Sequence, residues 1–238
     1  DYLPEPPSPL KPGMAGTLLD ETVDMEDIIA TLVDLARRKA ISITEDKVES
    51  RWSSKTDFIY RRELEDVPLS KYESVLLNAV FGNKDEVRLG DLKNKFYTKL
   101  PKLRSAMYEA VVEERLFPAN PDNVRNTYYA LGGLGIALAV GVGFAGMALL
   151  GWLTPTAILP GVGLGVLAIG LLILAKFMPR KSELGAEEAA KWQAFRTYLR
   201  DIDKYSDLEA QKEIWDRYLP YAIAFGIEKQ YMAKFAGV

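Results

Sequence analysis

Residues 126–175, NTYYALGGLGIALAVGVGFAGMALLGWLTPTAILPGVGLGVLAIGLLILA, decide the fold, because these 50 positions contain no Asp, Glu, Lys or Arg. Two prolines and two threonines within residues 152–160 interrupt the apolar run. The block therefore divides into two helices, at about residues 131–152 and 161–178. At 1.5 Å per residue they reach roughly 33 and 27 Å, which suits a hydrocarbon core of roughly 30 Å. We predict a two-helix transmembrane hairpin over residues 121–180.

A buried hairpin inside a soluble protein is the alternative. Two helices that are apolar on all sides need a large surrounding protein, and the rest of the chain is mostly amphipathic or polar. A cleaved signal peptide is excluded, because the block begins past the middle of the chain. Lys176, Arg180 and Lys181 lie at the end of the second helix, whereas the connecting loop carries no charge. By the positive-inside rule, both ends of the hairpin should face the cytoplasm.

Small residues recur every four positions in both predicted membrane helices, and such residues let helix backbones approach closely. The files are Gly133, Ala137, Gly141 and Ala145; Gly135, Ala139 and Gly143; and, in the second helix, Gly161 and Gly165. Either these files pack the two helices on each other, or one file is left over for a partner helix. Two files on the first helix slightly favour the second interpretation. Apart from Lys176 near the end of the second span, neither span holds a charged residue, which argues against an ion or proton path.

Composition excludes several kinds of chemistry. The chain has 238 residues, no Cys and no His, so disulfides, thiolate or imidazole metal sites and Ser-His-Asp triads are ruled out. There is no G-x-x-x-x-G-K-[ST] loop. We therefore expect no enzyme activity, no cofactor and no metal. A net charge of −3, from 30 basic and 33 acidic residues, indicates no particular partner.

The region before the hairpin should contain a linker and a small domain. Residues 1–16 include five prolines and show no apolar periodicity, which is typical of a semi-rigid linker. Helical spacing predicts a helix over residues 24–38. Two alternating runs, at residues 40–44 and 57–61, predict an antiparallel β-hairpin with a polar loop around Trp52.

The rest of this region predicts three more helical segments. Ser70 and Glu73 form a capping-box pattern at the start of a helix over residues 69–81. A short segment at 87–96 and a longer helix at 101–115 follow, so the order resembles a winged helix. The predicted fold class is accordingly a mainly α integral membrane protein. It comprises a cytoplasmic winged-helix-like α+β domain at residues 17–120, a two-helix transmembrane hairpin, and C-terminal amphipathic helices at 184–238.

Charge argues against DNA as the partner of that domain. Residues 1–125 carry 19 basic and 23 acidic side chains, and acidic residues offset the basic ones on the would-be recognition helix. A regulator would need its cations on one face. The cations concerned are Arg37, Arg38, Lys39, Arg61 and Arg62.

Two aromatic, amphipathic helices are predicted after the hairpin, at residues 184–202 and 213–235. Pro220 should bend or restart the second one. They either pack into the cytoplasmic domain or lie on the bilayer surface, which Trp and Tyr favour. The candidate interaction or interfacial residues are Trp192, Tyr198, Trp215, Tyr218 and Tyr221.

Several stretches together resemble the YciQ-like predicted membrane proteins, a prokaryotic family defined as a domain of unknown function. They are PPSPLKPGMAGTLLDE, DIIATLVDLARRKAISI, RLFPANPDNVR, EEAAKWQAFRTYLRD and WDRYLPYAIAFGIEK. The resemblance covers nearly the whole chain. It implies a multi-pass protein of the prokaryotic inner membrane, of which this chain is a C-terminal portion. The family brings no established catalytic residues.

The favoured function is a membrane-anchored interaction or scaffold protein that presents its cytoplasmic domain to another protein. Its expected partners are the lipid bilayer and either another protein or a second copy of the chain, and nucleic acid is not expected. The alternative is a membrane-tethered DNA-binding regulator that uses the winged-helix-like domain.

Overall fold

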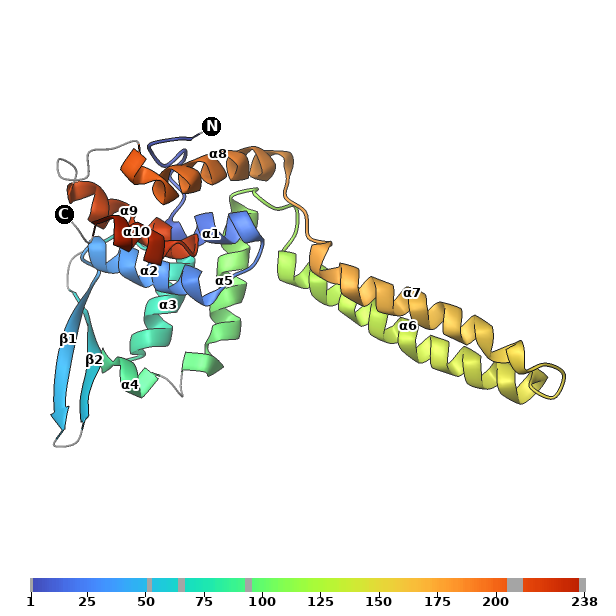
Figure 1. The fold of residues 1–238 in the computed structure, drawn as a ribbon. Coiled ribbons are helices and arrows are strands. Elements are labelled where there is room, and N and C mark those ends of the chain that lie inside the picture. The colour runs from blue at the N-terminus through green and yellow to red at the C-terminus, as the bar shows by residue number, and fades with distance from the viewer. Residues whose placement is uncertain (1, 51–52, 64–66, 93–95, 205–211, 236–238) are drawn as a thin grey trace. The chain divides into compact units, whose positions relative to one another are not determined.

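A computed structural model describes residues 2–50, 53–63, 67–92, 96–204 and 212–235 of the chain. It is mostly helical, with one small sheet. The chain forms two compact units (Figure 1). One, here called the split domain, combines residues 1–116 with 182–238; the other, the hairpin unit, is residues 117–181. The apolar hairpin is thus an insertion in a domain built from both sides of it.

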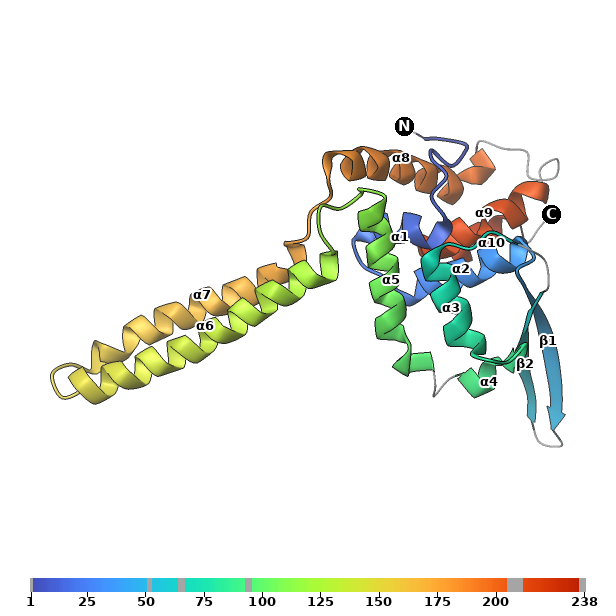
Figure 2. The same ribbon diagram turned by 180° about the vertical axis from the view of Figure 1, so that it is seen from behind.

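The split domain consists of helices packed together, with a small sheet at one side from which a β-hairpin projects (Figure 2). In chain order its elements are α1 (Pro12–Asp20), α2 (Met25–Arg37), β1 (Ile41–Ser50), β2 (Ser53–Arg62), α3 (Lys71–Phe81), β3 (Glu86–Arg88), α4 (Leu89–Leu92), a 3₁₀ turn (Phe96–Thr98), α5 (Leu100–Glu113), α8 (Glu183–Arg200), a 3₁₀ turn (Ile202–Lys204), α9 (Lys212–Ala224) and α10 (Glu228–Phe235).

The predicted β-hairpin is present, and its strands are longer than predicted. β1 pairs antiparallel with β2, with Ile41 opposite Arg62, and β2 also pairs antiparallel with β3, so the strand order is β1-β2-β3. Ile41 and Val87 are buried at the end of the sheet nearest the helices. The loop predicted around Trp52 includes residues outside the described ranges.

The helices predicted over residues 24–38, 69–81 and 101–115 lie where the sequence placed them, whereas the short helical segment predicted at 87–96 begins as strand β3 and continues as the single turn of α4. α2 begins after Asp24, whose backbone N–H donates to the Asp27 carboxylate at 3.2 Å. α3 begins after Ser70, whose N–H donates to Glu73 at 2.7 Å, as the capping box predicted. α5 packs against α3 and α1 and buries Leu103, a core residue with no exposed surface. Leu116 and Phe117, which follow α5, form a bend.

The linker prediction for residues 1–16 is wrong for its second half, because α1 lies at the centre of the split domain. α1 packs against α2, α5, α8 and α9. Its small residues permit this: a Cβ on Gly13 would lie 2.7 Å from the Asp27 carbonyl oxygen, and one on Gly16 would lie 2.8 Å from that of Ala224. A short helix that is buried on all sides has no apolar stripe, so the periodicity test could not detect it.

The C-terminal helices belong to the same core. Trp192, Phe195 and Tyr231 have no exposed surface. Pro220 does not restart the last helix, because α9 continues through it. The break comes at Gly226, which has a φ of 65° between α9 and α10, a left-handed conformation that glycine adopts readily.

The hairpin unit contains two helices that are long and apolar enough to cross a membrane. α6 (Pro121–Leu150) starts at the Asn120 cap and runs without interruption through the predicted first span. After a 3₁₀ turn (Pro155–Ile158), α7 (Leu159–Leu174) and a further turn (Ala175–Phe177) form the second span. Only 11% of the most apolar window of each is buried inside the protein. A core hairpin of a soluble protein would be mostly buried, so that alternative fails.

The seam between α6 and α7 uses the second small-residue file. A Cβ on Gly161 would lie 2.6 Å from the Ala139 carbonyl oxygen and from Gly143 Cα, whereas one on Gly165 would be 3.7 Å from Ala139. A Cβ on Gly133 or Gly141 would have nothing within 4 Å. The file of Gly133, Ala137, Gly141 and Ala145 is exposed along its whole length. These four residues therefore do not pack the hairpin. The two files are offset by two residues along α6, and a helix turns by about 200° over two residues, so the files lie on opposite sides of α6.

Candidate functional site: the anchor of the N-terminal segment

Four of the five predicted interaction residues lie together on α8 and α9. Trp192 stacks with Tyr221 at 5.3 Å between ring centroids. Phe195 joins the rest: its ring centroid lies 5.1 Å from that of Tyr218 and 6.4 Å from that of Tyr198. We call Trp192, Tyr198, Tyr218 and Tyr221 the aromatic face. Trp192, Tyr198 and Tyr218 are at most 3% exposed, so a position at the bilayer surface is excluded for them.

Trp215, the fifth predicted residue, belongs to a separate cluster. Its ring stacks on Tyr231 of α10 at 5.4 Å and lies 5.2 Å from Phe235. The Tyr231 hydroxyl donates to the Ile214 carbonyl oxygen at 3.0 Å. This cluster fastens α10 to α9.

The aromatic face holds the proline-rich residues 2–10, which form no helix or strand. The Tyr218 hydroxyl donates to the Pro4 carbonyl oxygen at 3.3 Å, and that of Tyr221 donates to the Leu10 carbonyl oxygen at 2.8 Å. The Trp192 indole N–H donates to the Ser8 hydroxyl at 3.2 Å. Tyr2 stacks on Tyr198, with centroids 6.2 Å apart and ring planes 16° from parallel. The N-terminal segment is therefore bound by side chains from the other end of the chain.

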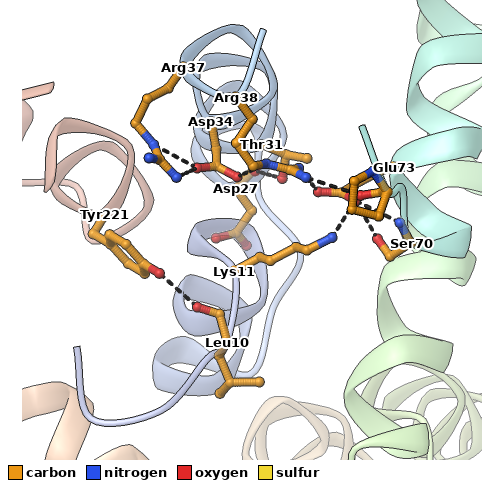
Figure 3. A network of polar contacts seen from close by, with 11 residues as sticks. Leu10, Lys11, Asp27, Thr31, Asp34, Arg37, Arg38, Ser70, Glu73 and Tyr221 are labelled. Carbon is orange, nitrogen blue, oxygen red and sulfur yellow. Dashed lines mark hydrogen bonds and ion pairs between the residues drawn. The ribbon is translucent and has the colours of Figure 1, made fainter. Parts of the chain in front are cut away.

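An ion network fixes the end of this segment to α2 and α3 (Figure 3). Lys11 forms an ion pair with Glu73 of α3. Arg38 bridges the helices: its guanidinium pairs with Glu73 and, at 2.9 Å, with Asp34 of α2. Asp34 also binds Arg37 at 2.9 Å. Figure 3 shows the Tyr221–Leu10 hydrogen bond beside this network, so the two anchors meet at residues 10 and 11.

Glu73 is the centre of the network, and its side chain has no exposed surface. Burial acts to raise its pKa, but the hydrogen bonds from Lys11 and Ser70 and the charge of Arg38 outweigh burial and hold the pKa below its ordinary value. Burial also raises the pKa of the Tyr221 hydroxyl to about 12, with the Asp34 charge adding to the effect. At neutral pH the carboxylate is charged and the phenol is a donor, as the contacts require.

Asp27, behind the network, is a buried acid. Its Oδ2 accepts from Thr17 Oγ1 at 3.0 Å and from the Asp24 backbone, while Oδ1 has no hydrogen-bond partner within the described part of the chain. Burial, followed by the nearby charge of Asp20, raises the Asp27 pKa to about 9. Through its hydrogen bond with Thr17, Asp27 holds α1 against α2. Asp27 is 1% exposed, so its carboxyl group cannot reach a substrate.

Comparison with known proteins identifies the family. Residues 1–235 match the model described as "Predicted membrane protein (DUF2207) C-terminal domain". The chain belongs to this family. The YciQ-like resemblance found in the sequence agrees with it. The search found no matching curated protein and no matching solved structure.

Sequence reasoning found the aromatic face of this DUF2207 family member but missed what it holds. Glu73 was recognised only as a helix cap, and Lys11 only as part of a linker. A signal was present in the sequence: four prolines precede α1, and prolines lack the N–H that a regular element would need. No local pattern connects such a segment to helices about 200 residues later.

Proposed function

We propose that this DUF2207 C-terminal domain is a membrane-anchored interaction or scaffold protein without catalytic activity, whose split domain presents a surface to another protein. The observation that carries the proposal is the anchored N-terminal segment. An aromatic face that donates hydrogen bonds to an extended chain is suited to holding a polypeptide. The charged residues of the ion network and Asp27 connect helices, which favours a binding role over acid–base chemistry.

The proposed topology is multi-pass in the inner membrane of a prokaryote, with both tails cytoplasmic. Support comes from Lys176, Arg180 and Lys181 at the end of the second span and from the uncharged loop between the spans. Single-cysteine reporters suit this Cys-free chain. Thr156→Cys, in the loop, should react with an impermeant thiol reagent on intact cells, and Gln230→Cys, exposed on α10, should react only after lysis. If Gln230→Cys reacted on intact cells and Thr156→Cys reacted only after lysis, the orientation would be the reverse of the proposed one.

The bilayer is the first proposed partner, and a second copy or another membrane helix is the next. The exposed file of Gly133, Ala137, Gly141 and Ala145 lies on α6 away from the hairpin seam. Small residues are favourable against another helix and give little contact with lipid chains. Gly141→Leu should therefore reduce any crosslinked oligomer while the hairpin itself stays intact.

The DNA-binding alternative has one observation in its favour and one against it. In its favour, the β1–β2 hairpin pairs with β3 through β2, and β3 lies between α3 and α5 in the chain. The hairpin and these helices therefore form one unit, as a winged helix requires. Against it, four of the five required cations are engaged elsewhere. Arg37 and Arg38 pair with Asp34, Arg61 pairs with Glu86 at 2.6 Å, and Arg62 lies over the Phe81 ring. Adjacent strand residues also point to opposite faces.

A crosslinked pull-down from native membranes tests the interaction proposal. The intact chain, tagged at its C-terminus, should capture one or a few proteins in stoichiometric amounts. A chain in which residues 117–181 are replaced by an unrelated two-helix hairpin is the control, because it keeps the split domain. If the chain with the native hairpin captures these proteins and the control chain does not, the split domain is not the interaction module.

A further inference from the structure

We propose that the aromatic face is a recognition surface for proline-rich segments of other proteins, and that residues 2–10 of the chain itself occupy it. This inference rests on the proposed interaction function and names the partner class. The contacts made by the chain's own segment show which chemistry the surface accepts.

The first step is the match between donors and acceptors. The aromatic face donates three hydrogen bonds to the segment, from Trp192, Tyr218 and Tyr221. All three acceptors are oxygens. A proline-rich chain suits such a surface, because each proline keeps its carbonyl acceptor but has no N–H that must find a partner. Four of the nine residues from 2 to 10 are prolines.

The second step is that most of these contacts do not depend on the ligand's side chains. Tyr218 and Tyr221 bind main-chain carbonyl oxygens. Two side chains add selectivity: Ser8 offers a hydroxyl to Trp192, and Tyr2 offers a ring to Tyr198. The expected ligand therefore has an aromatic residue two positions before the first bound carbonyl and a hydroxyl four positions after it, in a proline-rich context.

The third step is that the segment's own residues are buried only where it meets α1, whereas residues 2–9 are half-buried or exposed. Leu10 is 8% exposed, and Lys11 pairs with the buried Glu73, so the segment is fixed where it enters α1. Towards its start it is open: Tyr2 is 48% exposed, and Pro4 and Pro9 are also exposed. Residues 2–9 can therefore leave the aromatic face without unfolding α1.

The consequence is competition within the chain. A segment tethered beside its own site has an effective concentration in the millimolar range. A partner's segment therefore binds weakly until the tethered segment is released or weakened. Weakening it should improve binding of an added peptide by about tenfold or more.

The test uses the full chain in detergent micelles and a fluorescent peptide, YLPEPPSPLK, which copies residues 2–11. Binding is measured by anisotropy. In the weakened chain, Tyr2→Ala is combined with glycine at Pro4, Pro6 and Pro7, which leaves the aromatic face and Lys11 unchanged. We expect the weakened chain to bind the peptide at least tenfold more tightly than the wild type. Adding Tyr218→Phe, which removes the hydroxyl that binds the Pro4 carbonyl, should weaken binding two- to tenfold, as expected for one lost hydrogen bond.

The control peptide replaces every proline with serine and should bind at least tenfold more weakly. The proposal is overturned if the weakened chain keeps its thermal unfolding temperature yet does not bind the peptide, or binds both peptides equally. If the weakened chain fails to fold, the wild type is used at millimolar peptide with a photoreactive residue in place of the peptide's tyrosine. Adducts on α8 or α9 then support the proposal, and adducts elsewhere or none overturn it.

A second copy could also supply the segment. Wild-type chains would then form a concentration-dependent dimer that the weakened chain does not form, and this result would replace the proposed partner by the chain itself. Failure of peptide binding would leave the interaction function standing if the pull-down from native membranes still captures a partner through the split domain. The two proposals therefore fail separately.

Discussion

Replacing Gly161 with Ala tests how closely α6 and α7 approach each other. The added Cβ would lie 2.6 Å from the Ala139 carbonyl oxygen and from the Cα and N of Gly143. These are backbone atoms that cannot rotate away, and carbon contacts are most favourable at about 3.5–4.0 Å. The helices would have to separate by about 1 Å at this point.

Forcing one extra methyl group into a packed contact typically costs about 1–3 kcal/mol. Alanine also improves helix propensity over glycine by up to about 1 kcal/mol, which would hide part of the loss. Gly141→Ala is the matched control, since a Cβ there meets nothing within 4 Å and receives the same gain in propensity. The free energies of unfolding of the two variants should therefore differ by about 1–3 kcal/mol.

The assay is reversible unfolding of the full chain in mixed micelles, with the helix separation followed by a pair of spin labels on engineered cysteines. Gly161→Ala should be the less stable variant and should show the longer separation. Equal stability, or greater damage from Gly141→Ala, would refute the assignment of the seam to Gly135, Ala139 and Gly143.

Other predictions concern the split domain. Glu73→Gln should destabilise it by about 2–3 kcal/mol in urea unfolding, because Lys11 and Arg38 lose their buried partner but keep some contact with water. Since the Glu73 pKa is lowered, its stabilisation is lost as the pH falls, and the variant should lose less on acidification. Asp27, with its pKa raised to about 9, stays protonated in the folded protein, whereas it ionises when the chain unfolds. Wild-type stability should therefore fall as the pH rises from about 4 to 9. In pH-dependent unfolding, Asp27→Asn should reduce that loss of stability. Trp215→Ala should cost about 2 kcal/mol and increase hydrogen exchange in α10, because it removes a half-buried ring; unchanged exchange would contradict that role.

The sequence alone determined the apolar hairpin, the strong helices and the β-hairpin. These features depend on neighbours along the chain: an uncharged run of 50 residues, a helical period, or a capping pair such as Ser70 and Glu73. Local periodicity also predicted that the two helices after the hairpin each have one apolar face, but it left open whether that face packs into the domain or lies on the bilayer.

Only the tertiary structure decided which small-residue file packs the hairpin. Both files on α6 have the same spacing, and they differ only in whether they face α7. It also decided the place of α1, whose small residues are surrounded on all sides and leave no periodic signal. The contacts of Tyr218 and Tyr221 with Pro4 and Leu10 join residues more than 200 positions apart. Such contacts depend on the packing of the whole domain, because no local preference of either segment specifies its distant partner.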